Sequence, residues 1–285
     1  MEKIALITDS TGGIPKEYIN KFNINLVNLK VIYQDKEYIE GVTITAKEVY
    51  DRLDKEVPTT SMPSVSDVCN LYEKLIAEGY THAIVVTISS GLSGTINSFR
   101  LAASQYEDKI NSFVFDSKSI SMGSGALIVE AGRMLQAGKD FDYICNKIVE
   151  IRENTDLYFS VETLSYLIKG GRIGKVAGGI GEMLNLKPII TMDNVDGKYT
   201  TVTKVRGSKQ SFHKLVKLAE ESLSRFKCRV VIATGNMYDE VQKLQDAIKD
   251  NENLVSLHNV ILSPVAGIHS GPKLLGIIIF PYYEY

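Results

Sequence analysis

The sequence predicts an α/β protein of two lobes, and three observations support this fold class. Short runs rich in β-branched residues alternate with longer amphipathic segments, and glycine, proline, serine or aspartate marks each switch. The 285 residues exceed one typical domain. After a strand that starts at Leu157, the alternation of strands and helices also gives way to two strands joined by a hairpin. We therefore predict an N-terminal three-layer α/β/α lobe with a mainly parallel sheet, residues 1–155, and a smaller C-terminal α/β lobe with a mixed sheet, residues 156–285.

Strands and helices alternate along the first half of the chain, which predicts a parallel sheet covered by helices. The strand candidates are IALIT from Ile4, INLVNLKVIY from Ile24, HAIVVTIS from His82, SFVFDS from Ser112 and LYFSV from Leu157. Helices are expected around Tyr18, around Tyr50, and over Ser64–Glu78, Ser93–Tyr106, Met122–Gln136 and Tyr143–Glu153. The helix at Ser64 begins with SVSD, a capping-box-like start in which Asp67 replaces the usual glutamate.

The second half begins with a hairpin signal. KPIITMDNVDGKYTTVTKV is typical of two strands joined through Val195-Asp196-Gly197. A helix over Gln210–Phe226, the strand VVIAT, a helix around Val241, a strand near Leu254–Leu262 and a final strand LLGIIIF follow. The boundary between the lobes is expected within Arg152–Thr163. No internal repeat or low-complexity linker is present, so the two lobes should pack closely.

Composition excludes several function classes. Lysine and arginine total 32 against 34 aspartate and glutamate, so the net charge of -2 provides no broad field for nucleic acid. Three cysteines far apart favour reduced thiols rather than a disulfide framework, and the four scattered histidines lack metal-site spacing. The N-terminus lacks signal-peptide features and no apolar run could span a bilayer, so we expect a cytoplasmic protein without stable membrane insertion.

Two hydroxyl-rich turns are candidates for binding an anion. SSGLSGT, Ser89–Thr95, follows a strand and precedes a helix, so its amides and hydroxyls should converge at a helix N-terminus. It lacks the lysine followed by a hydroxyl residue that ends a Walker A loop, and it lacks the glycine spacing of the dinucleotide-binding fingerprint. A plain serine N-cap is the alternative. TTSMPS, Thr59–Ser64, supplies three hydroxyls that could approach the same sheet edge, or it is a solvated loop.

Other motifs allow structural explanations. Asp9-Ser10-Thr11 could be catalytic, although such residues commonly cap the next helix. In IHSGPKLLG, His269 stands on a predicted glycine-proline turn, where a histidine bonded to backbone is the alternative to a functional one. In SYLIKGGRIGK, two glycines would end a helix after Ile168, with Arg172 favourably placed near its negative end.

Taken together, six motifs occur in the order seen in the DegV family of bacterial fatty-acid-binding proteins, which this chain resembles over essentially its whole length. They are DST near the N-terminus, TSxPS, SSGLSGT, DSKSIS at Asp116–Ser121, SYLIKGGRIGK, and HSGPxxxG near the C-terminus. The resemblance implies that one long-chain fatty acid binds between the lobes, its carboxylate held by hydroxyls. It also implies a carrier rather than an enzyme, without a cofactor, and some members deliver the acid to a separate fatty-acid kinase for acyl phosphate formation.

The resemblance assigns roles to residues of this sequence. Thr60 and Ser93 are the expected carboxylate ligands. Ser61 and the amide of Gly94 are supporting candidates, and His269 corresponds to the family histidine close to the head group. Arg172 is expected to hold the charged head or to meet the kinase, and Arg206 in KVRGSK is a weaker candidate for the same basic rim.

The sequence also departs from the family pattern. Met62 stands where glutamine is frequent, Lys273 where glycine is frequent, and Gly13 where an acidic residue is common. Lys273 puts the turn near the head group in doubt and could alter kinase docking. Met62 could reshape the mouth of the pocket.

Two alternatives remain at this stage. One is a regulatory module that binds a lipid or a small anion without a kinase. The other is a serine-dependent hydrolase using the SSGLSGT hydroxyls, for which the sequence offers no GxSxG elbow and no recognisable Ser-His-Asp order.

Overall fold

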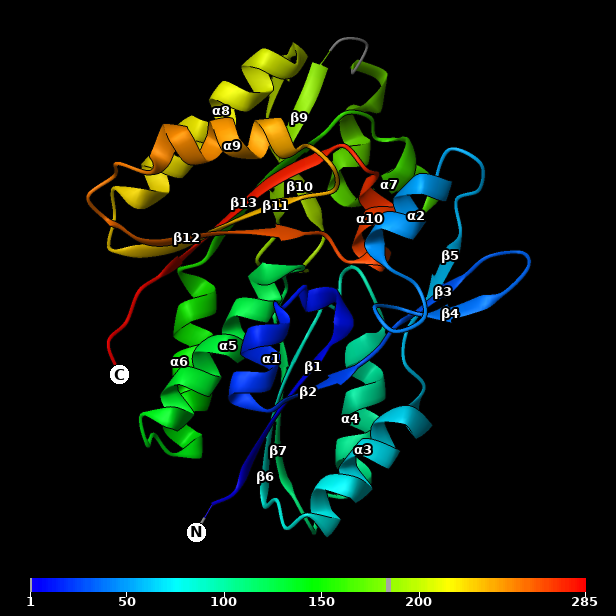
Figure 1. Cartoon of the computed structure of the whole chain (residues 1–285), viewed down its shortest axis with the longest axis vertical. Coiled ribbons are helices and arrows are strands. Elements are labelled where there is room, and N and C mark those ends of the chain that lie inside the picture. Colours follow the sequence, from blue (N-terminus) through cyan, green and yellow to red (C-terminus); the bar gives the residue numbers. More distant parts are fainter. Residues whose placement is uncertain (1, 183–185) are drawn as a thin grey trace.

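A computed structural model describes residues 2–182 and 186–285 of the chain as two stacked lobes (Figure 1). The N-terminal lobe contains a parallel sheet in the order β2 (Ile24–Val27), β1 (Ile4–Asp9), β6 (His82–Thr87) and β7 (Asn111–Asp116). The C-terminal lobe contains a mixed sheet in the order β10 (Tyr199–Arg206), β9 (Leu186–Met192), β8 (Asp156–Val161), β13 (Leu274–Pro281), β11 (Cys228–Thr234) and β12 (Leu254–Ile261). The predicted fold class is confirmed.

Helices cover both faces of the parallel sheet (Figure 1). α1 (Lys16–Phe22), α5 (Met122–Gln136) and α6 (Phe141–Glu153) lie on one face, and α3 (Val65–Ala77) and α4 (Thr95–Gln105) lie on the other. Along β1, Leu6 packs on the first group and Ile7 on the second, as the two-residue period of a strand requires. The predicted capping box is present, since Ser64 and Asp67 each accept a hydrogen bond from the other's amide.

The strands at the centre of the C-terminal lobe are apolar on both faces. On β11, Val230 and Ile232 pack beneath α8 (Gly207–Leu223) and α9 (Tyr238–Ile248). Val231 and Ala233 point the other way, into an apolar cluster shared with Met122 and other residues of the N-terminal lobe. Removing this inner face from water contributes about 25 cal/mol per Å² of apolar surface, so burial favours docking of the two lobes.

A small antiparallel sheet lies beside the junction, in the order β4 (Glu37–Ile39), β3 (Lys30–Ile32) and β5 (Thr59–Ser61). The single strand predicted from Ile24 is wrong, because it divides at Asn28 and Leu29 into β2 and β3, which belong to different sheets. At the break, the Asn28 side chain donates to the Glu40 carbonyl and the Leu29 amide donates to the Ser10 hydroxyl. The small sheet and α2 (Ala46–Arg52) pack against α10 (Pro264–Ser270), a helix that the sequence analysis missed.

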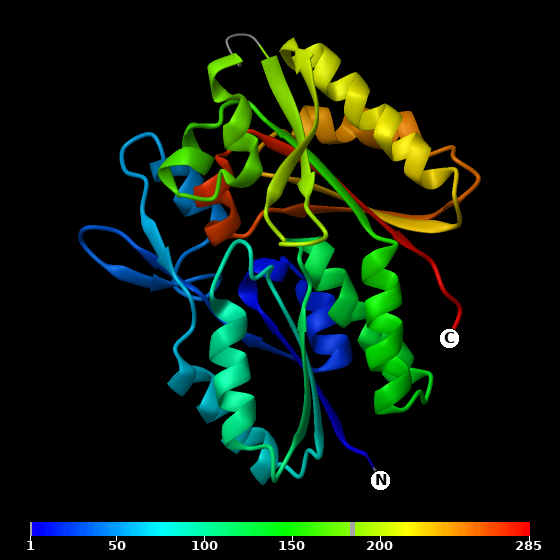
Figure 2. The ribbon, with the colours of Figure 1, turned by 180° about the vertical axis from the view of Figure 1, so that it is seen from behind.

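The β9–β10 hairpin reaches from the C-terminal lobe onto the SSGLSGT loop (Figure 2). The Ser89 hydroxyl donates to the carbonyl oxygen of Gly197 at 2.6 Å. Lys118 Nζ donates to the carbonyl oxygens of Asn194 and Val195, at 3.0 and 2.8 Å. The first serine of the loop and the lysine of DSKSIS thus hold the lobes together.

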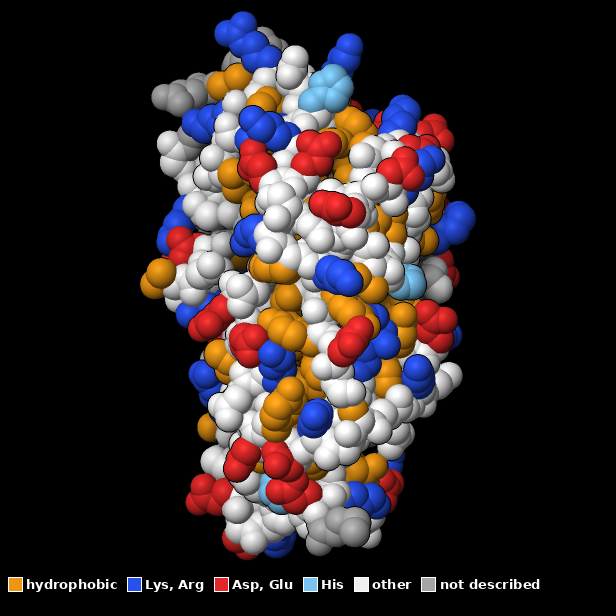
Figure 3. Space-filling view, turned by 90° about the vertical axis from the view of Figure 1, so that its left-hand side faces the viewer, with side chains coloured by type: hydrophobic (Ala, Val, Ile, Leu, Met, Phe, Trp, Pro, Cys, Tyr) orange, Lys and Arg blue, Asp and Glu red, His pale blue; other side chains and the backbone are white. Residues whose placement is uncertain are grey.

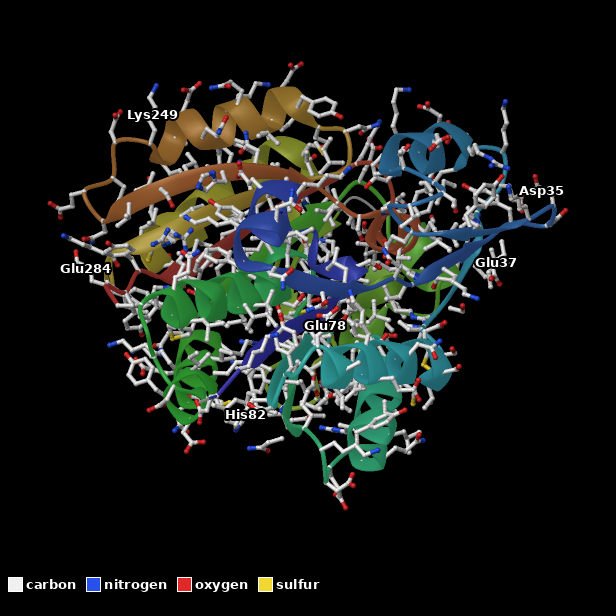
Figure 4. The ribbon with its side chains drawn as sticks, turned by 60° about the horizontal axis from the view of Figure 1, so that its bottom comes forward. Asp35, Glu37, Glu78, His82, Lys249 and Glu284 are labelled. Atoms are coloured by element: carbon white, nitrogen blue, oxygen red, sulfur yellow. The ribbon has the colours of Figure 1, made fainter. Side chains whose placement is uncertain are left out.

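Charges of both signs are interspersed over the face shown in Figure 3, consistent with the near-neutral composition. In Figure 4, Asp35 and Glu37 lie at the tip of the β3–β4 hairpin, on the opposite side of the molecule from Lys249 at the end of α9. All three cysteines are unpaired, as predicted. None of the helices in the described part of the chain combines the length and apolar character that a bilayer crossing requires.

Close contact at the hairpin predicts that Gly91→Ala destabilises the protein. A β-carbon at Gly91 would lie 2.4 Å from backbone atoms of both Asp196 and Gly197, so the lobes would have to shift. We expect the free energy of unfolding to fall by about 1–3 kcal/mol, measured by chemical denaturation. Gly178→Ala is the control, because a β-carbon there meets nothing within 4 Å. Equal stability of the two variants would contradict this packing.

Candidate functional site

Four segments that are distant in the sequence line one pocket between the lobes. They are β5 with Met62, the SSGLSGT loop, the turn after α7 (Ser165–Lys169), and α10. The structure therefore brings together five predicted site residues, namely Thr60, Ser61, Ser93, Arg172 and His269. Leu29, Ile88, Leu92, Ile120, Tyr199, Val265 and Ala266 complete the lining with Met62. We call this the head pocket.

His269 and Thr60 form a partly buried polar pair in the head pocket. Thr60 Oγ1 lies 2.9 Å from His269 Nε2, while His269 Nδ1 is buried without a partner in the described residues. Burial, with the nearby Arg172 charge as a second cause, lowers the pKa of His269 to about 4. The imidazole is therefore neutral at pH 7 and available for hydrogen bonding.

The position of His269 depends on how α10 is held. Ser263 caps this helix and Pro264 occupies its first turn, a start signal that the sequence contains. The buried carboxylate of Glu40 accepts from the Val265 amide at 2.7 Å and from the Ser10 hydroxyl. His269 is thus in the last turn of a helix, and its predicted placement on a glycine-proline turn is wrong.

The KGGR stretch packs directly on the imidazole. A β-carbon at Gly170 would lie 2.1 Å from His269 Nδ1, so only glycine leaves room for the ring. Gly171 has φ of +69°, a conformation that glycine adopts without strain. The chain ends α7 here, as the sequence predicted, and delivers Arg172 to the pocket.

Arg172 is a cation without a counter-charge in the described part of the chain. Its Nε donates to the Leu92 carbonyl at 3.1 Å and its Nη1 to the Gly170 carbonyl at 2.6 Å. These two bonds fix the guanidinium across the junction of the lobes. The remaining donors favour an anion, since arginine forms its strongest hydrogen bonds with carboxylate and phosphate oxygens.

Ser93 adds a hydroxyl to the lining of the head pocket. Its Oγ lies 2.8 Å from Thr95 Oγ1 at the start of α4, where the N-cap residue Gly94 provides no side-chain cap. The other serines of this motif are engaged elsewhere, Ser89 at the hairpin and Ser90 with the carboxylate of Asp116. Gly94 is exposed, and its backbone lies beside Met62.

An apolar cavity lies next to the head pocket, under the inner face of the large sheet. The two spaces share Ile120, Tyr199 and Ala266. The lining beyond them is mainly apolar and comprises Leu157, Phe159, Ala233, Leu262, Leu274, Gly276 and Ile278, with Ser121, Tyr158 and Ser270. The free space is narrow, about 40 Å³ in the head pocket and about 30 Å³ in this tail cavity.

Sequence reasoning missed Tyr199 and Ser121. Tyr199 lines both spaces, and its burial raises the pKa of the phenol, against the influence of Arg172. Ser121 lines the tail cavity with φ of +53° and a buried hydroxyl that has no partner in the described residues. Neither belongs to a motif with a local chemical signature, although Ser121 ends the recognised DSKSIS string.

Two other residues singled out from the sequence lie away from the head pocket. Arg206 is exposed at the far end of β10, seven residues from Tyr199 or about 23 Å along the strand, so it is not brought to the head group. Lys273 forms an ion pair with Glu162 at 2.8 Å, on a different groove. Met62 is 48% exposed at the rim of the head pocket.

Neither a metal site nor a catalytic triad is formed in the described residues. No three histidine, cysteine, aspartate or glutamate side chains within 2–182 and 186–285 cluster in a way that could hold a metal ion. In the same ranges no carboxylate bonds to His269, and Ser93 bonds to Thr95 rather than to an imidazole. The DST motif is structural, since Asp9 caps the following 3-10 turn and accepts from the Ile88 amide.

Fold and cavities together define a two-lobed α/β protein with a polar pocket and an apolar cavity side by side between its lobes. The family model described as an uncharacterised protein of the DegV family matches residues 3–282, and the chain belongs to this family. A DegV domain-containing protein of Clostridium acetobutylicum is 53% identical over 280 residues, covering 98% of this chain and 99% of that protein.

Solved structures of the family carry the same fold. A fatty-acid-binding DegV family protein from Thermus thermophilus aligns with a TM-score of 0.92 at 27% identity, covering 98% of this chain and 100% of that one. A stearic-acid-binding protein from Eubacterium ventriosum aligns with a TM-score of 0.86 at 28% identity, covering 99% and 98%. The predicted family is confirmed, and solved members of it bind fatty acids.

The lowered pKa of His269 predicts a pH dependence of stability. Its folded value of about 4 lies below the ordinary 6.5, so the unfolded chain takes up this proton at higher pH than the folded protein does. The free energy of unfolding should therefore fall between pH 6.5 and pH 4, by roughly 3 kcal/mol from this group. His269→Gln should remove that component, measured by denaturation at pH 7, 5.5 and 4.5. Parallel pH profiles for the two proteins would show that His269 is not buried and neutral.

Proposed function

We propose that this protein binds one long-chain fatty acid, with its carboxylate in the head pocket and its tail between the lobes. The observation that carries the proposal is that a cationic, hydroxyl-lined pocket lies directly beside an apolar cavity and shares three lining residues with it. Thr60, Ser93, His269 and Arg172 surround the carboxylate, while Ser61 and the Gly94 amide support it. Fatty acid binding by solved relatives of the same fold supports this assignment.

The tail and the carboxylate of a fatty acid contribute different amounts of binding free energy. Burying an acyl chain contributes about 0.8 kcal/mol per methylene, or on the order of 10 kcal/mol for a dozen before ordering costs. A hydrogen bond to the carboxylate adds only about 1.5–3 kcal/mol. The tail therefore sets the affinity, and the polar residues fix which end of the molecule lies in the head pocket.

The tail cavity must widen to bind a long acyl chain. Its free space of about 30 Å³ corresponds to about one water molecule rather than to a chain of many methylenes. The lobes meet through apolar side chains at this place, and side-chain shifts or a small separation of the lobes would admit the tail. The fatty acid would then replace lobe-to-lobe contacts with its own.

We further infer that the protein presents the acid to a separate fatty-acid kinase. Met62 lines the head pocket and is exposed, as is Gly94 beside it, so the carboxylate end of a bound acid would face the outside while its tail is buried. Arg172 could then neutralise an acyl phosphate as well as a carboxylate. A kinase that uses ATP is consistent with a location in the cytoplasm.

The head pocket is poorly suited to catalysis by this chain alone. With a pKa of about 4, His269 is far from the value at which a general base works at neutral pH. Within the described residues no carboxylate orients it. A carrier without catalytic residues of its own is therefore proposed over a serine hydrolase.

Substitutions in the head pocket should weaken binding by about tenfold, the equivalent of one lost charged hydrogen bond. We expect this for Ser93→Ala and Arg172→Ala when delipidated protein is titrated with a labelled long-chain fatty acid. Arg206→Ala is the control and should bind normally, because Arg206 lies outside the pocket. Unchanged affinity of both pocket variants would contradict the assignment of the head pocket.

A kinase assay separates binding from presentation. With a fatty-acid kinase and ATP, protein preloaded to saturation should yield acyl phosphate, trapped as the hydroxamate, and Ser93→Ala should reduce this yield more than it reduces binding. Normal binding with no acyl phosphate from the wild-type protein would leave the alternative of a regulatory lipid-binding module.

Enlarging a side chain of the tail cavity should shorten the preferred ligand. Ala233 is buried on the inner face of β11, so leucine at this position would occupy space needed by the tail. Mass spectrometry of acids bound from an equimolar mixture should show a shift to shorter chains for Ala233→Leu. Val230→Leu enlarges the outer face of the same strand and should leave the chain-length distribution unchanged. An identical distribution for Ala233→Leu would place the tail elsewhere.

A further inference from the structure

A second groove lies on the outer face of the C-terminal lobe and shares no lining residue with the head pocket or the tail cavity. It has a free space of about 390 Å³, far larger than either. Neighbouring residues of β13 separate the spaces, since Leu274 lines the tail cavity and Leu275 lines this groove.

Two helices begin at this groove. The first turns of α8 and α9 contribute to its lining through Ser208, Lys209 and Glu240. Neither N-cap residue, Arg206 or Met237, supplies a side-chain cap to its helix. The amides of an uncapped first turn, together with the positive end of the helix dipole, favour an anion.

A buried hydroxyl provides a second, independent indication of a ligand. Ser211, on the second turn of α8, lines the groove and is only 3% exposed. Its Oγ has no hydrogen-bond partner among the described residues. A buried polar atom left without a partner is unfavourable, by about 1–3 kcal/mol, and a bound oxyanion would provide an acceptor for this hydroxyl.

The charged residues around the groove are mostly basic. The lining contains four lysines, one histidine and two glutamates: Lys187, Lys209, Lys243, Lys273, His213, Glu162 and Glu240. Lys273 neutralises Glu162 at 2.8 Å. Lys209 and Lys243 form no ion pair within residues 2–182 and 186–285. The opposing charges are Glu240 in the lining and Asp239 beside it in the first turn of α9.

We propose that this groove binds a phosphate group, either inorganic phosphate or the phosphate of a small ester. Two helix N-termini, a buried hydroxyl donor and two lysines without acidic partners supply the donors that a compact dianion requires. A small ligand fits a concave site of this size, whose lining includes Phe212 and Met237 beside the donors. The site is independent of fatty acid binding.

Calorimetric titration with inorganic phosphate tests the proposal. Saturable binding is expected, weakened about tenfold by Lys209→Ala and by Lys243→Ala, and weakened also by Ser211→Ala. Lys217→Ala is the matched control, since Lys217 lies on α8 outside the groove and pairs with Glu221. Arg172→Ala should bind phosphate normally.

A second titration with ribose 5-phosphate identifies the source of the phosphate. Tighter binding of the ester than of inorganic phosphate would point to a phosphorylated small molecule, and equal or weaker binding to inorganic phosphate itself. Absence of saturable binding of both probes at millimolar concentration would overturn the proposal. So would binding that is lost in Arg172→Ala but kept in Lys209→Ala and Lys243→Ala, because the anion would then occupy the head pocket.

Discussion

The structure depends on one constraint: the central strands of the C-terminal sheet are apolar on both faces. Helices α8 and α9 cover the outer face, and the N-terminal lobe must cover the inner one. The two lobes cannot separate fully without exposing that face, yet their contact leaves a narrow cavity beneath Ala233 and Leu274. The same burial that joins the lobes therefore provides an apolar site for a ligand tail.

Polar side chains at the rim of this interface are brought together by contacts between residues that are distant in the sequence. The hydroxyl of Thr60 meets His269 across 209 positions of the sequence, and Glu40 holds the start of the helix that carries the histidine. Gly170 leaves room for the imidazole, and Arg172 bonds to the loop of the opposite lobe. A neutral histidine, hydroxyls and a guanidinium that forms no ion pair with the described residues then lie beside an apolar cavity, an arrangement complementary to a molecule with one anionic end.

Much of this could be predicted from the sequence, because local periodicity and family motifs carry strong signals. The three layers of the first lobe, the Ser64 capping box, the hairpin and five of the pocket residues follow from them. Strand β5 is three residues long and polar, so its pairing with β3 has no local signature. Helix α10 is short and fully apolar apart from its ends, and its Ser263-Pro264 start was overlooked. The role of Tyr199 and the distance of Arg206 from the pocket depend on the course of β10 in three dimensions.

Denaturing extraction of the purified protein, followed by mass spectrometry of the released small molecules, tests the central claim most directly. Approximately one long-chain fatty acid per protein chain is the predicted result, and it would also identify the preferred chain length. The claim would be contradicted if the purified protein released no lipid and also took up no fatty acid when one was supplied. Release of a polar anion instead of a fatty acid would contradict it too.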